Sequence, residues 1–470
     1  MTSRSRDGLI APIQSVRIEN FRGVRDLTIH LDPQVTVFFG ANAAGKTTLL
    51  DALAIGLGAI VARVPRAKGV TFRKHGDIRV PWKDRPEVGE RSGVECSFSR
   101  ITLSNASERS WGVQKMRWAG DTPPHGFVGV KQLNDALDPI VREALDGGEG
   151  TAEYQRALPL IAAYGTERSV VAVPLRKRNF KEEFQRFGAL DESLRTSTRF
   201  KSVFEWFVVA EDEERRERER RQDFHFRSPT LEWVRGAIER AGLRCRNPRI
   251  ETKPSLRMLV DFEHADGSLE TLDVAWLSDG YRTHFALIVD IARRMVQLNP
   301  SSDLQAKGRG TLSEAVILID EIDLHLHPTW QATVVKGLQD AFPQAQFVLT
   351  THSEQVIGSV PARCVRKLVA GDGEIWVENV AFAEGATSER ILIDLMGAKE
   401  RAGAATEGEN TKLLEDYLKL ISAGVGHTEA AKALRIKLDQ ALPRDDERLH
   451  QADLEMLKQD LLRDLEGGGR

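Results

Sequence analysis

Eight residues near the N-terminus have the spacing of a phosphate-binding loop. Residues 40–47 read G-A-N-A-A-G-K-T, which matches the pattern G-x-x-x-x-G-K-[ST]. The glycines let backbone N–H groups curl around phosphate oxygens, and Lys46 would place a charge at the β- and γ-phosphates. The Thr47 hydroxyl would bind Mg²⁺, and the following helix would present its positive end to the anion. The pattern predicts a site for ATP and Mg²⁺ formed by Gly40, Asn42, Ala43, Ala44, Gly45, Lys46, Thr47 and Thr48.

An acidic pair follows an apolar run later in the chain. Residues 315–319 read A-V-I-L-I, and Asp320 and Glu321 come directly after them. Such a run predicts a buried strand, and its end would place Asp320 in the shell of Mg²⁺ together with Thr47. Glu321 would then polarise a water molecule in line with the γ-phosphate. We therefore predict Asp320 and Thr47 as metal ligands and Glu321 as a catalytic residue.

Two further segments could complete such a site. Residues 277–282 read L-S-D-G-Y-R and precede a predicted helix, so Ser278 and Gly280 could bind an anion at its N-terminus. An ordinary helix cap is the alternative for this segment. Residues 350–353 read T-T-H-S and follow a predicted strand. Because a histidine at the carboxyl end of such a strand could reach a γ-phosphate, we predict His352 as a second catalytic residue.

Hydrophobic patterns indicate the elements that must position these residues. Alternating residues predict two half-buried strands at 15–19 and 27–31, and the apolar spacing of residues 46–64 predicts a helix. Continuous apolar runs predict buried strands, and a helix between the last two of them implies that they are parallel. The buried strands are expected at 35–39, 158–164, 315–319 and 347–349, the intervening helix at 329–341, a strand-like run at 93–99, a strand pair at 258–262 and 269–274, and the helix after the second anion site at 281–298. The order of strand, glycine-rich turn and helix is typical of an α/β nucleotide-binding domain.

Two other regions are predicted to be helical. One extends from about 180 to 245, and within it residues 211–221 read E-D-E-E-R-R-E-R-E-R-R. Glu or Asp four residues before Arg stabilises an exposed helix, and a nucleic-acid contact is the alternative. The other extends beyond about residue 385, where three leucine-rich stripes would either pack on the preceding domain or serve assembly. These stripes are Leu413, Leu414, Tyr417, Leu418 and Ile421; Leu434, Leu438 and Leu442; and Leu454, Leu457, Leu461 and Leu465.

Composition excludes several classes of protein. The chain has 470 residues, of which 41% are hydrophobic and 29% charged, as is typical of a globular protein. The formal net charge of −3, from 66 basic and 69 acidic residues, excludes a strongly basic DNA-coating protein but not a local basic patch. Three cysteines are too few for a disulfide framework or a cysteine zinc site. Since neither a membrane span nor a signal-peptide core is visible, we expect a soluble cytoplasmic protein without a membrane partner.

Taken together, the motifs resemble the ABC-type ATPase heads of the SMC, RecF and double-strand-break-repair group. The resemblance implies an α/β fold, a P-loop NTPase of ABC/SMC-head type with a short helical insertion and an α-helical C-terminal tail. It also implies ATP hydrolysis and a head-to-tail homodimer or higher oligomer, in which the signature of one chain meets the ATP bound by the other. The similar segments are Asp320–Glu321 (Walker B), residues 277–282 (signature), residues 322–324 (D-loop), His352 (switch histidine) and residues 17–23, R-I-E-N-F-R-G (opening of RecF-like heads).

These similarities predict four regions along the chain. An ATPase lobe with the phosphate loop is expected at residues 13–180 and a helical insertion at 181–250. The second ATPase lobe, with signature, Walker B pair and switch histidine, is expected at 251–385, and a helical module at 386–470.

A narrower resemblance is to stand-alone bacterial ATPases of the AAA family. Members include PtuA-like ATPases of Septu and of some retron anti-phage systems, which pair with an HNH endonuclease. The resemblance implies a nuclease partner and a role in defence. It rests on residues 163–168 (A-Y-G-T-E-R), 204–207 (F-E-W-F) and 323–328 (D-L-H-L-H-P), and on Ala430-Ala431 and Asp445-Asp446 in the tail.

The chain also departs from the pattern of these families. No glutamine occurs between Phe72 and Arg91, where a Q-loop would lie, and Asp77 is a weak substitute. Asp279 occupies a position where the signature usually has a small residue. Asp323, His325 and His327 could suggest a metal site, but a D-loop and a turn before Pro328 explain them. Neither a Toprim nor an HNH nuclease constellation is visible within the chain.

Three functions remain open at this point. The first is an ATPase whose head dimer controls a separate nuclease. The second is a RecF-like repair ATPase that binds DNA. The third is a nucleotide-gated scaffold with little turnover.

Overall fold

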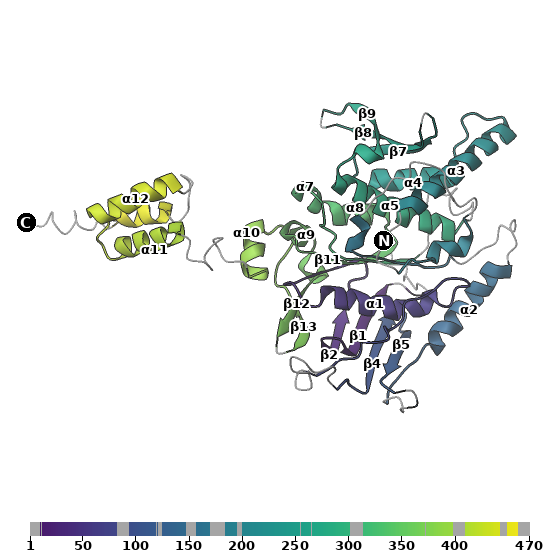
Figure 1. The fold of residues 1–470 in the computed structure, drawn as a ribbon, viewed down its shortest axis with the longest axis horizontal. Helices are drawn as coiled ribbons and strands as arrows, with labels where there is room; N and C mark the ends of the chain where they lie inside the picture. The colour runs from purple at the N-terminus through teal and green to yellow at the C-terminus, as the bar shows by residue number, and fades with distance from the viewer. Residues whose placement is uncertain are drawn as a thin grey trace, which may run out of the picture. The chain divides into compact units, whose positions relative to one another are not determined.

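The computed structural model describes residue 10 and residues 12–81, 94–118, 120, 125–146, 157–169, 184–194, 200–253, 255–264, 266–300, 314–371, 373–397, 409–441 and 449–458 (Figure 1). The chain divides into two compact units, Met1–Ile391 and Leu392–Arg470. All of the predicted nucleotide-site residues belong to the first unit. None of the described helices is long and apolar enough to cross a membrane.

A six-stranded sheet forms the centre of the first unit, in the order β13-β12-β3-β11-β10-β6. Four neighbouring strands are parallel and have every residue buried, because the sheet is covered on both faces. These are β3 (Val35–Phe39), β11 (Ala345–Thr350), β10 (Ala315–Ile319) and β6 (Leu160–Tyr164). The predicted buried strands are confirmed, as is the parallel direction predicted for the last two of them.

A hairpin that the sequence analysis did not predict extends this sheet. Strand β12 (Val365–Gly371) lies parallel to β3, and β13 (Glu374–Asn379) pairs antiparallel with β12. Both strands are only partly buried and lack a continuous apolar run, which is the feature that identified the other strands.

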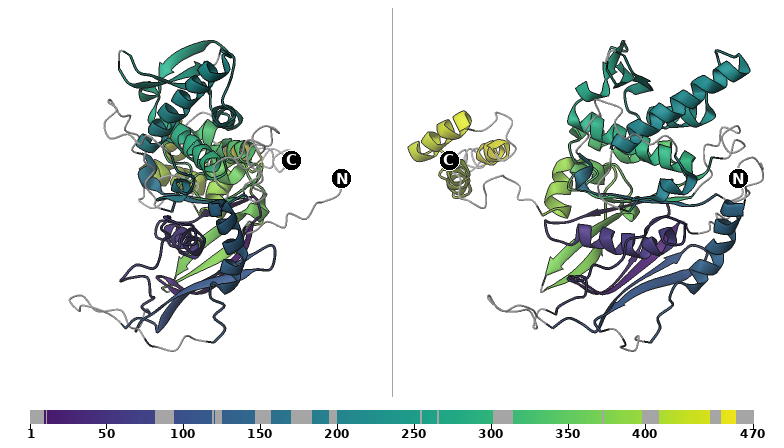
Figure 2. Two further views of the ribbon diagram at one scale, coloured as in Figure 1. Left: turned by 90° about the vertical axis from the view of Figure 1, so that its right-hand side faces the viewer. Right: turned by 45° about the vertical axis from the view of Figure 1, so that its right-hand side comes forward.

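A second, antiparallel sheet has the order β2-β1-β4-β5. It consists of β1 (Ile13–Phe21), β2 (Val24–His30), β4 (Phe98–Asn105) and β5 (Ser110–Met116). Helix α1 (Lys46–Val61) lies between the two sheets and contacts both, which explains why it is apolar nearly all round (Figure 2). Helix α2 (Lys131–Asp146) packs on β5. The strand-like run expected at 93–99 is wrong, since β4 begins only at Phe98 and Gly93 lies outside the described residues.

The region predicted to be helical, at about 180–245, contains helices, and a small third sheet follows it. Helices α3 (Phe200–Arg221) and α4 (Pro229–Arg240) pack on α5 (Asp279–Leu298). The third sheet is antiparallel and has the order β7-β8-β9, formed by β7 (Cys245–Glu251), β8 (Arg257–Glu263) and β9 (Leu269–Asp273). The predicted strand pair is therefore confirmed. Short helices η2 (Thr166–Ser169), η3 (Arg186–Leu190), η4 (Val274–Trp276) and η5 (Ala362–Cys364) connect these elements.

The charged run in α3 has one exposed face and one covered face. Arg220 and Arg221 lie in solvent and pair with Glu217. In the first half, Glu214 is buried and Glu211 accepts a hydrogen bond from the backbone N–H of Ile250, which fixes α3 against β7. Burial raises the pKa of Glu211 to about 7. The predicted exposed face is confirmed, since Glu213, Arg216 and Arg220 are exposed along the run, while α4 and β7 cover the opposite side of its beginning.

The connection from β10 to β11 contains two helices instead of the single predicted one. Helix α7 (Pro328–Gln331) starts at His327, whose side chain accepts a hydrogen bond from the N–H of Thr329. Helix α8 (Val334–Ala341) begins after Thr333, whose N–H bonds the carbonyl of Trp330 three residues back. This tightened turn interrupts the helix. Helix α9 (Glu354–Gly358) follows β11.

The second unit has its own core. Its helices are α11 (Glu409–Ser422), α12 (Glu429–Ala441) and a last segment at residues 449–458; α10 (Ser388–Arg390) and a π-helical turn (Ile391–Leu395) precede them. The buried residues of this core are Leu414, Tyr417, Ile421, Ala431, Leu438, Leu449 and Ala452, with Leu413, Leu418 and Leu434 partly buried against them. The first predicted stripe and the described part of the second are confirmed.

The described part of the third predicted stripe does not join this core. The side chains of Leu454 and Leu457 are 61% and 63% exposed. The last helix instead packs through Leu449, Ala452 and Met456, which have the same helical spacing on another face. Leu442, Leu461 and Leu465 lie outside the described residues.

Candidate nucleotide-binding and hydrolysis site

The predicted phosphate loop joins the end of β3 to the start of α1. Gly45 is the N-cap of α1 and has a φ of 95°, a conformation in which a side chain would be strained. No side chain caps this end of the helix, so its positive end faces the loop. The buried Lys46 ammonium donates to the carbonyls of Gly40 (2.9 Å) and Ala41 (3.1 Å), and it therefore lies folded into the loop.

The unpredicted hairpin β12–β13 forms the floor of this loop. A Cβ atom on Gly40 would lie 2.3 Å from the carbonyl oxygen of Leu368 in β12. A Cβ atom on Gly45 would lie 2.5 Å from Cδ1 of Ile375 in β13. Close packing against the backbone of β12 thus requires Gly40, and the positive φ of Gly45 favours glycine there. Of the other predicted loop residues, Asn42, Ala43 and Thr47 are exposed, Ala44 is buried and Thr48 is half-buried.

The structure brings Thr47 and Asp320 together, although 273 residues separate them. The Thr47 hydroxyl donates to Asp320 Oδ2 at 3.0 Å, and the Thr350 hydroxyl donates to Asp320 Oδ1 at 2.5 Å. A hydroxyl oxygen and a carboxylate oxygen side by side are the hard donors that suit Mg²⁺. The residues at this position therefore fit the predicted metal.

Glu321 occupies the turn directly after β10. Its backbone N–H donates to the Thr350 hydroxyl at 2.7 Å, and its φ of 48° is unusual for a residue with a side chain. Thr350 thereby holds both acidic residues, a role that the sequence analysis missed while it singled out the neighbouring His352. Backbone in this conformation is found preferentially at functional sites.

Carboxylates near the loop affect the pKa of Lys46. Burial lowers the pKa of this lysine, while Glu321, Asp320 and Asp323 oppose the shift. The ammonium is thus surrounded by acidic groups on the side of the Walker B strand.

The predicted switch histidine lies beside the D-loop. The backbone N–H of His352 and the hydroxyl of Thr351 both donate to Asp323 Oδ1, at 3.3 and 2.6 Å. Since β3, β11 and β10 are neighbours in the sheet, their carboxyl ends place Gly40, His352 and Asp320 along one edge. Asp323 accepts these two hydrogen bonds, and His327 accepts one from the N–H of Thr329, as a D-loop and a turn would require.

The signature-like segment begins helix α5. Ser278 is the N-cap of α5 and is exposed, and its side chain makes no capping hydrogen bond. Asp279 forms an ion pair with Arg282. A Cβ atom on Gly280 would lie 2.3 Å from the carbonyl oxygen of His325, so the start of α5 packs directly on the D-loop. Among the described residues, no hydrogen bond or ion pair joins this segment to the phosphate loop.

The aspartate considered for the Q-loop position has structural partners. Asp77 is fully buried and accepts hydrogen bonds from Arg22 Nε (2.9 Å) and from the N–H of Arg73 (2.6 Å). Arg22 also donates to Asp51 of α1 at 2.7 Å. These contacts tie the β1–β2 hairpin to the helix that follows the phosphate loop.

The sheet, the phosphate loop and the acidic pair define a P-loop fold. Residues 35–358 match the family described as "AAA domain, putative AbiEii toxin, Type IV TA system", and the chain belongs to this family. The predicted fold class and family resemblance are confirmed.

Two named proteins and one solved structure are similar to the chain. The chain is 26% identical over 519 residues to the "Retron Ec83 probable ATPase" of Escherichia coli. The match covers 97% of this chain and 89% of that protein. It is 38% identical over 127 residues to the "Septu protein PtuA" of Bacillus thuringiensis, covering 23% of this chain and 31% of that protein. A solved SMC head bound to the C-winged helix domain of ScpA aligns with a TM-score of 0.41 and 14% identity, over 78% of this chain and 97% of that one.

Proposed function

We propose that the protein binds ATP with Mg²⁺ at the phosphate loop and hydrolyses it to ADP and phosphate. The hydrogen bond from Thr47 to Asp320 carries this proposal, because it joins the two motifs at the position of the metal. Thr47 and Asp320 would hold Mg²⁺, which would neutralise phosphate charge. Lys46 would exchange its carbonyl partners for phosphate oxygens, and Glu321 would accept the proton of the attacking water.

The role of Lys46 can be tested by Lys46→Ala. The variant loses charge-assisted hydrogen bonds to the phosphates, so we expect ATP to bind about tenfold to hundredfold more weakly and turnover to fall with it. Isothermal titration and phosphate release measure the two quantities. Lys336→Ala, which removes an exposed lysine of α8, is the matched control and should behave like wild type. Unchanged affinity in Lys46→Ala would contradict the proposed site.

We also propose that two chains associate head to tail, so that Ser278 and Gly280 of one chain complete the ATP site of the other. The exposed Ser278 hydroxyl and the N-terminus of α5 support this proposal, because together they can donate hydrogen bonds to a γ-phosphate. The packing of Gly280 on the D-loop would place the two motifs in one contact surface.

A third part of the proposal concerns the partner. The relatives named after retrons and Septu support an ATPase of bacterial anti-phage defence that regulates a separate nuclease, which the family resemblance predicts to be of HNH type. The second unit is a candidate for assembly, because it has its own core and exposes Leu454 and Leu457. Large exposed apolar side chains on one helix are typical of contact surfaces.

The assembly role predicts the result of removing the second unit. Deletion from residue 405 onward should leave ATP affinity unchanged, because the site lies wholly in the first unit, and should disrupt a higher oligomer or the partner complex. Light scattering and copurification with a nuclease encoded beside the gene measure this. In the full chain, Leu454→Ser with Leu457→Ser should have the same effect, and His450→Ser with Lys458→Ser is the control on the same helix. Unchanged assembly in the deletion would refute the role.

A further inference from the structure

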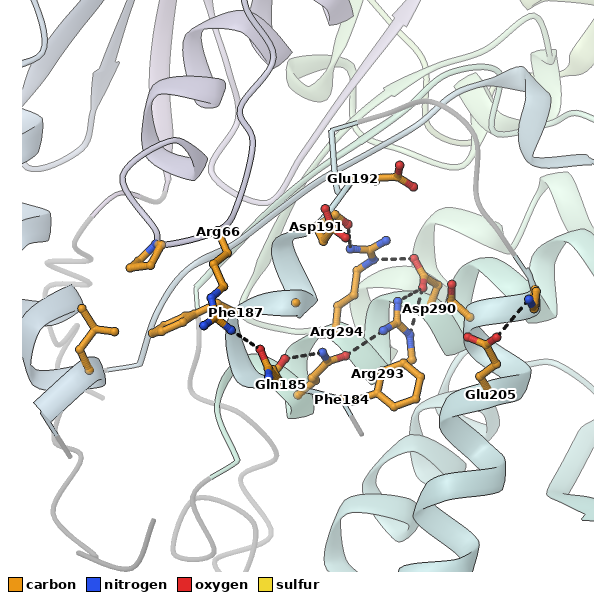
Figure 3. A pocket seen from close by; sticks show the side chains of 16 residues that line it. Arg66, Phe184, Gln185, Phe187, Asp191, Glu192, Glu205, Asp290, Arg293 and Arg294 are labelled. Atoms are coloured by element: carbon orange, nitrogen blue, oxygen red, sulfur yellow. Dashed lines mark hydrogen bonds and ion pairs between the residues drawn. The ribbon is translucent and has the colours of Figure 1, made fainter. Parts of the chain in front are cut away.

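One buried carboxylate of the signature helix receives hydrogen bonds from two different elements. Asp290 is 1% exposed, and it lies between Arg293 and Arg294 of its own helix α5 (Figure 3). Arg294 Nε donates to Oδ2 at 2.7 Å, and Arg293 Nε donates to Oδ1 at 3.2 Å. The hydroxyl of Tyr164, from strand β6, donates to Oδ2 at 3.0 Å. The carboxylate therefore joins α5 to the edge of the central sheet.

The same tyrosine also contacts the Walker B strand. Tyr164 is the last residue of β6 and lies opposite Ile319 in the parallel pair β6–β10. Its carbonyl oxygen accepts a hydrogen bond of 2.8 Å from the backbone N–H of Asp320. One residue thus touches Asp290 through its side chain and the predicted metal ligand through its backbone.

Helix α5 connects this contact to the signature-like segment. Ser278 caps the helix, and Asp290 follows twelve residues later, about 18 Å along a rigid α-helix. The far end of α5 is also attached to β6, because the Asn299 side chain accepts from the N–H of Leu158 (2.9 Å) and donates to its carbonyl (3.0 Å). Hydrogen bonds at two heights therefore join α5 to β6 and to the residues just before it.

The electrostatic surroundings favour this hydrogen bond. Burial and the neighbouring Asp290 raise the pKa of Tyr164, so its hydroxyl remains a donor. Burial alone would raise the pKa of Asp290, but Arg294 and Arg293 outweigh it and lower the pKa, so the acceptor remains charged. A neutral donor and a charged acceptor form a strong and directional link.

We propose that Tyr164 is a positioning residue, which transmits the position of the signature end of α5 to Asp320. When a nucleotide bound by the partner chain pulls on Ser278, the shift of α5 would reach Asp320 through Asp290 and Tyr164. The inference rests on the head-to-tail dimer proposed above. It adds that engagement of the signature in one site changes hydrolysis in the site of the same chain.

The test compares Tyr164→Phe and Ser278→Ala, singly and together. Tyr164→Phe removes only the hydroxyl, and Asp290 retains both of its arginine partners. We expect kcat to fall about tenfold while the ATP Kd stays within about twofold. Adding Ser278→Ala should then cost little, although Ser278→Ala alone lowers kcat in the wild-type background. Tyr417→Phe, which removes a buried hydroxyl in the second unit, is the matched control and should change neither constant.

A structural role of the hydroxyl would give a different result. If the two substitutions multiply their separate effects, or if Tyr164→Phe leaves kcat unchanged, the inference is overturned. If Ser278→Ala has no effect even in the wild-type background, the proposed dimer site fails first and the inference fails with it. The wild-type background therefore separates the two failures.

Amide hydrogen exchange gives a second measurement, and its comparison of the wild type with Ser278→Ala does not depend on the folding of Tyr164→Phe. ATP should increase protection in residues 279–290 and in residues 315–320 together in the wild type, and Ser278→Ala should remove both increases. In Tyr164→Phe only the increase in α5 should remain. Unchanged protection of residues 315–320 on adding ATP to the wild type would also overturn the inference.

Discussion

Glu321→Gln is expected to bind Mg²⁺·ATP with the affinity of the wild type and to hydrolyse it at least about 100-fold more slowly. Glutamine keeps the volume of the side chain and removes the group that accepts the proton of water. ATP should then persist in the site, and the variant should accumulate in the nucleotide-bound state.

The structure gives reasons to expect a specific effect on chemistry. Glu321 is held by its backbone N–H, which bonds Thr350, and glutamine retains that contact. Thr350 and Thr47 bond Asp320 independently of the Glu321 side chain. Loss of a carboxylate beside Lys46 also leaves the ammonium with less opposing charge, which does not weaken phosphate binding.

Single-turnover hydrolysis and the lifetime of bound ATP after filtration measure the two effects separately. Glu384→Gln, at an exposed position outside the site, is the matched control and should have wild-type kinetics. Wild-type turnover in Glu321→Gln would refute the assignment of Glu321 as the group that accepts the proton of water. Equal loss of affinity and turnover would instead indicate a role in binding.

Local patterns were sufficient to predict the elements that bear the chemistry. The strand Val35–Phe39, the phosphate loop and the helix after it are continuous in the sequence, so the loop could be identified without the fold. The buried strand Ala315–Ile319 is continuous as well, and it places Asp320 at a defined end. In each case the residues that determine the structure lie within a few positions of one another.

Contacts between distant segments could not be predicted in this way. The floor of the phosphate loop comes from Leu368 and Ile375, more than 300 residues away, in strands that have no clear apolar pattern. The Tyr164–Asp290 hydrogen bond joins residues 126 positions apart. Leu454 and Leu457 show a related difficulty, because one helix carries two apolar stripes of the same period and only tertiary packing decides which of them joins the core.

Mixing Lys46→Ala with Ser278→Arg is expected to restore part of the ATPase rate that each variant lacks alone. In a head-to-tail dimer, Lys46→Ala damages one side of each site and Ser278→Arg damages the other, so both homodimers should be inactive. In a mixed dimer one site carries both lesions. The other site joins an intact Lys46 to an intact Ser278 and should hydrolyse ATP.

The expected gain is limited by the fraction of mixed dimers. Random exchange of equal amounts gives half of the dimers as mixed, each with one intact site of two, so roughly a quarter of the wild-type rate is the upper limit if sites act independently. If each site lay within one chain, no mixture could recover activity.

The nucleotide content of the mixed dimer removes the remaining ambiguity. The two variants carry different affinity tags, so that mixed dimers are isolated before bound ATP is counted. The intact site should retain one ATP per mixed dimer even where hydrolysis needs both sites, and the Lys46→Ala homodimer should retain little. Absence of both recovered turnover and retained ATP in isolated mixed dimers would exclude the head-to-tail site. Retention without turnover would show that the shared site exists and that hydrolysis requires both sites at once.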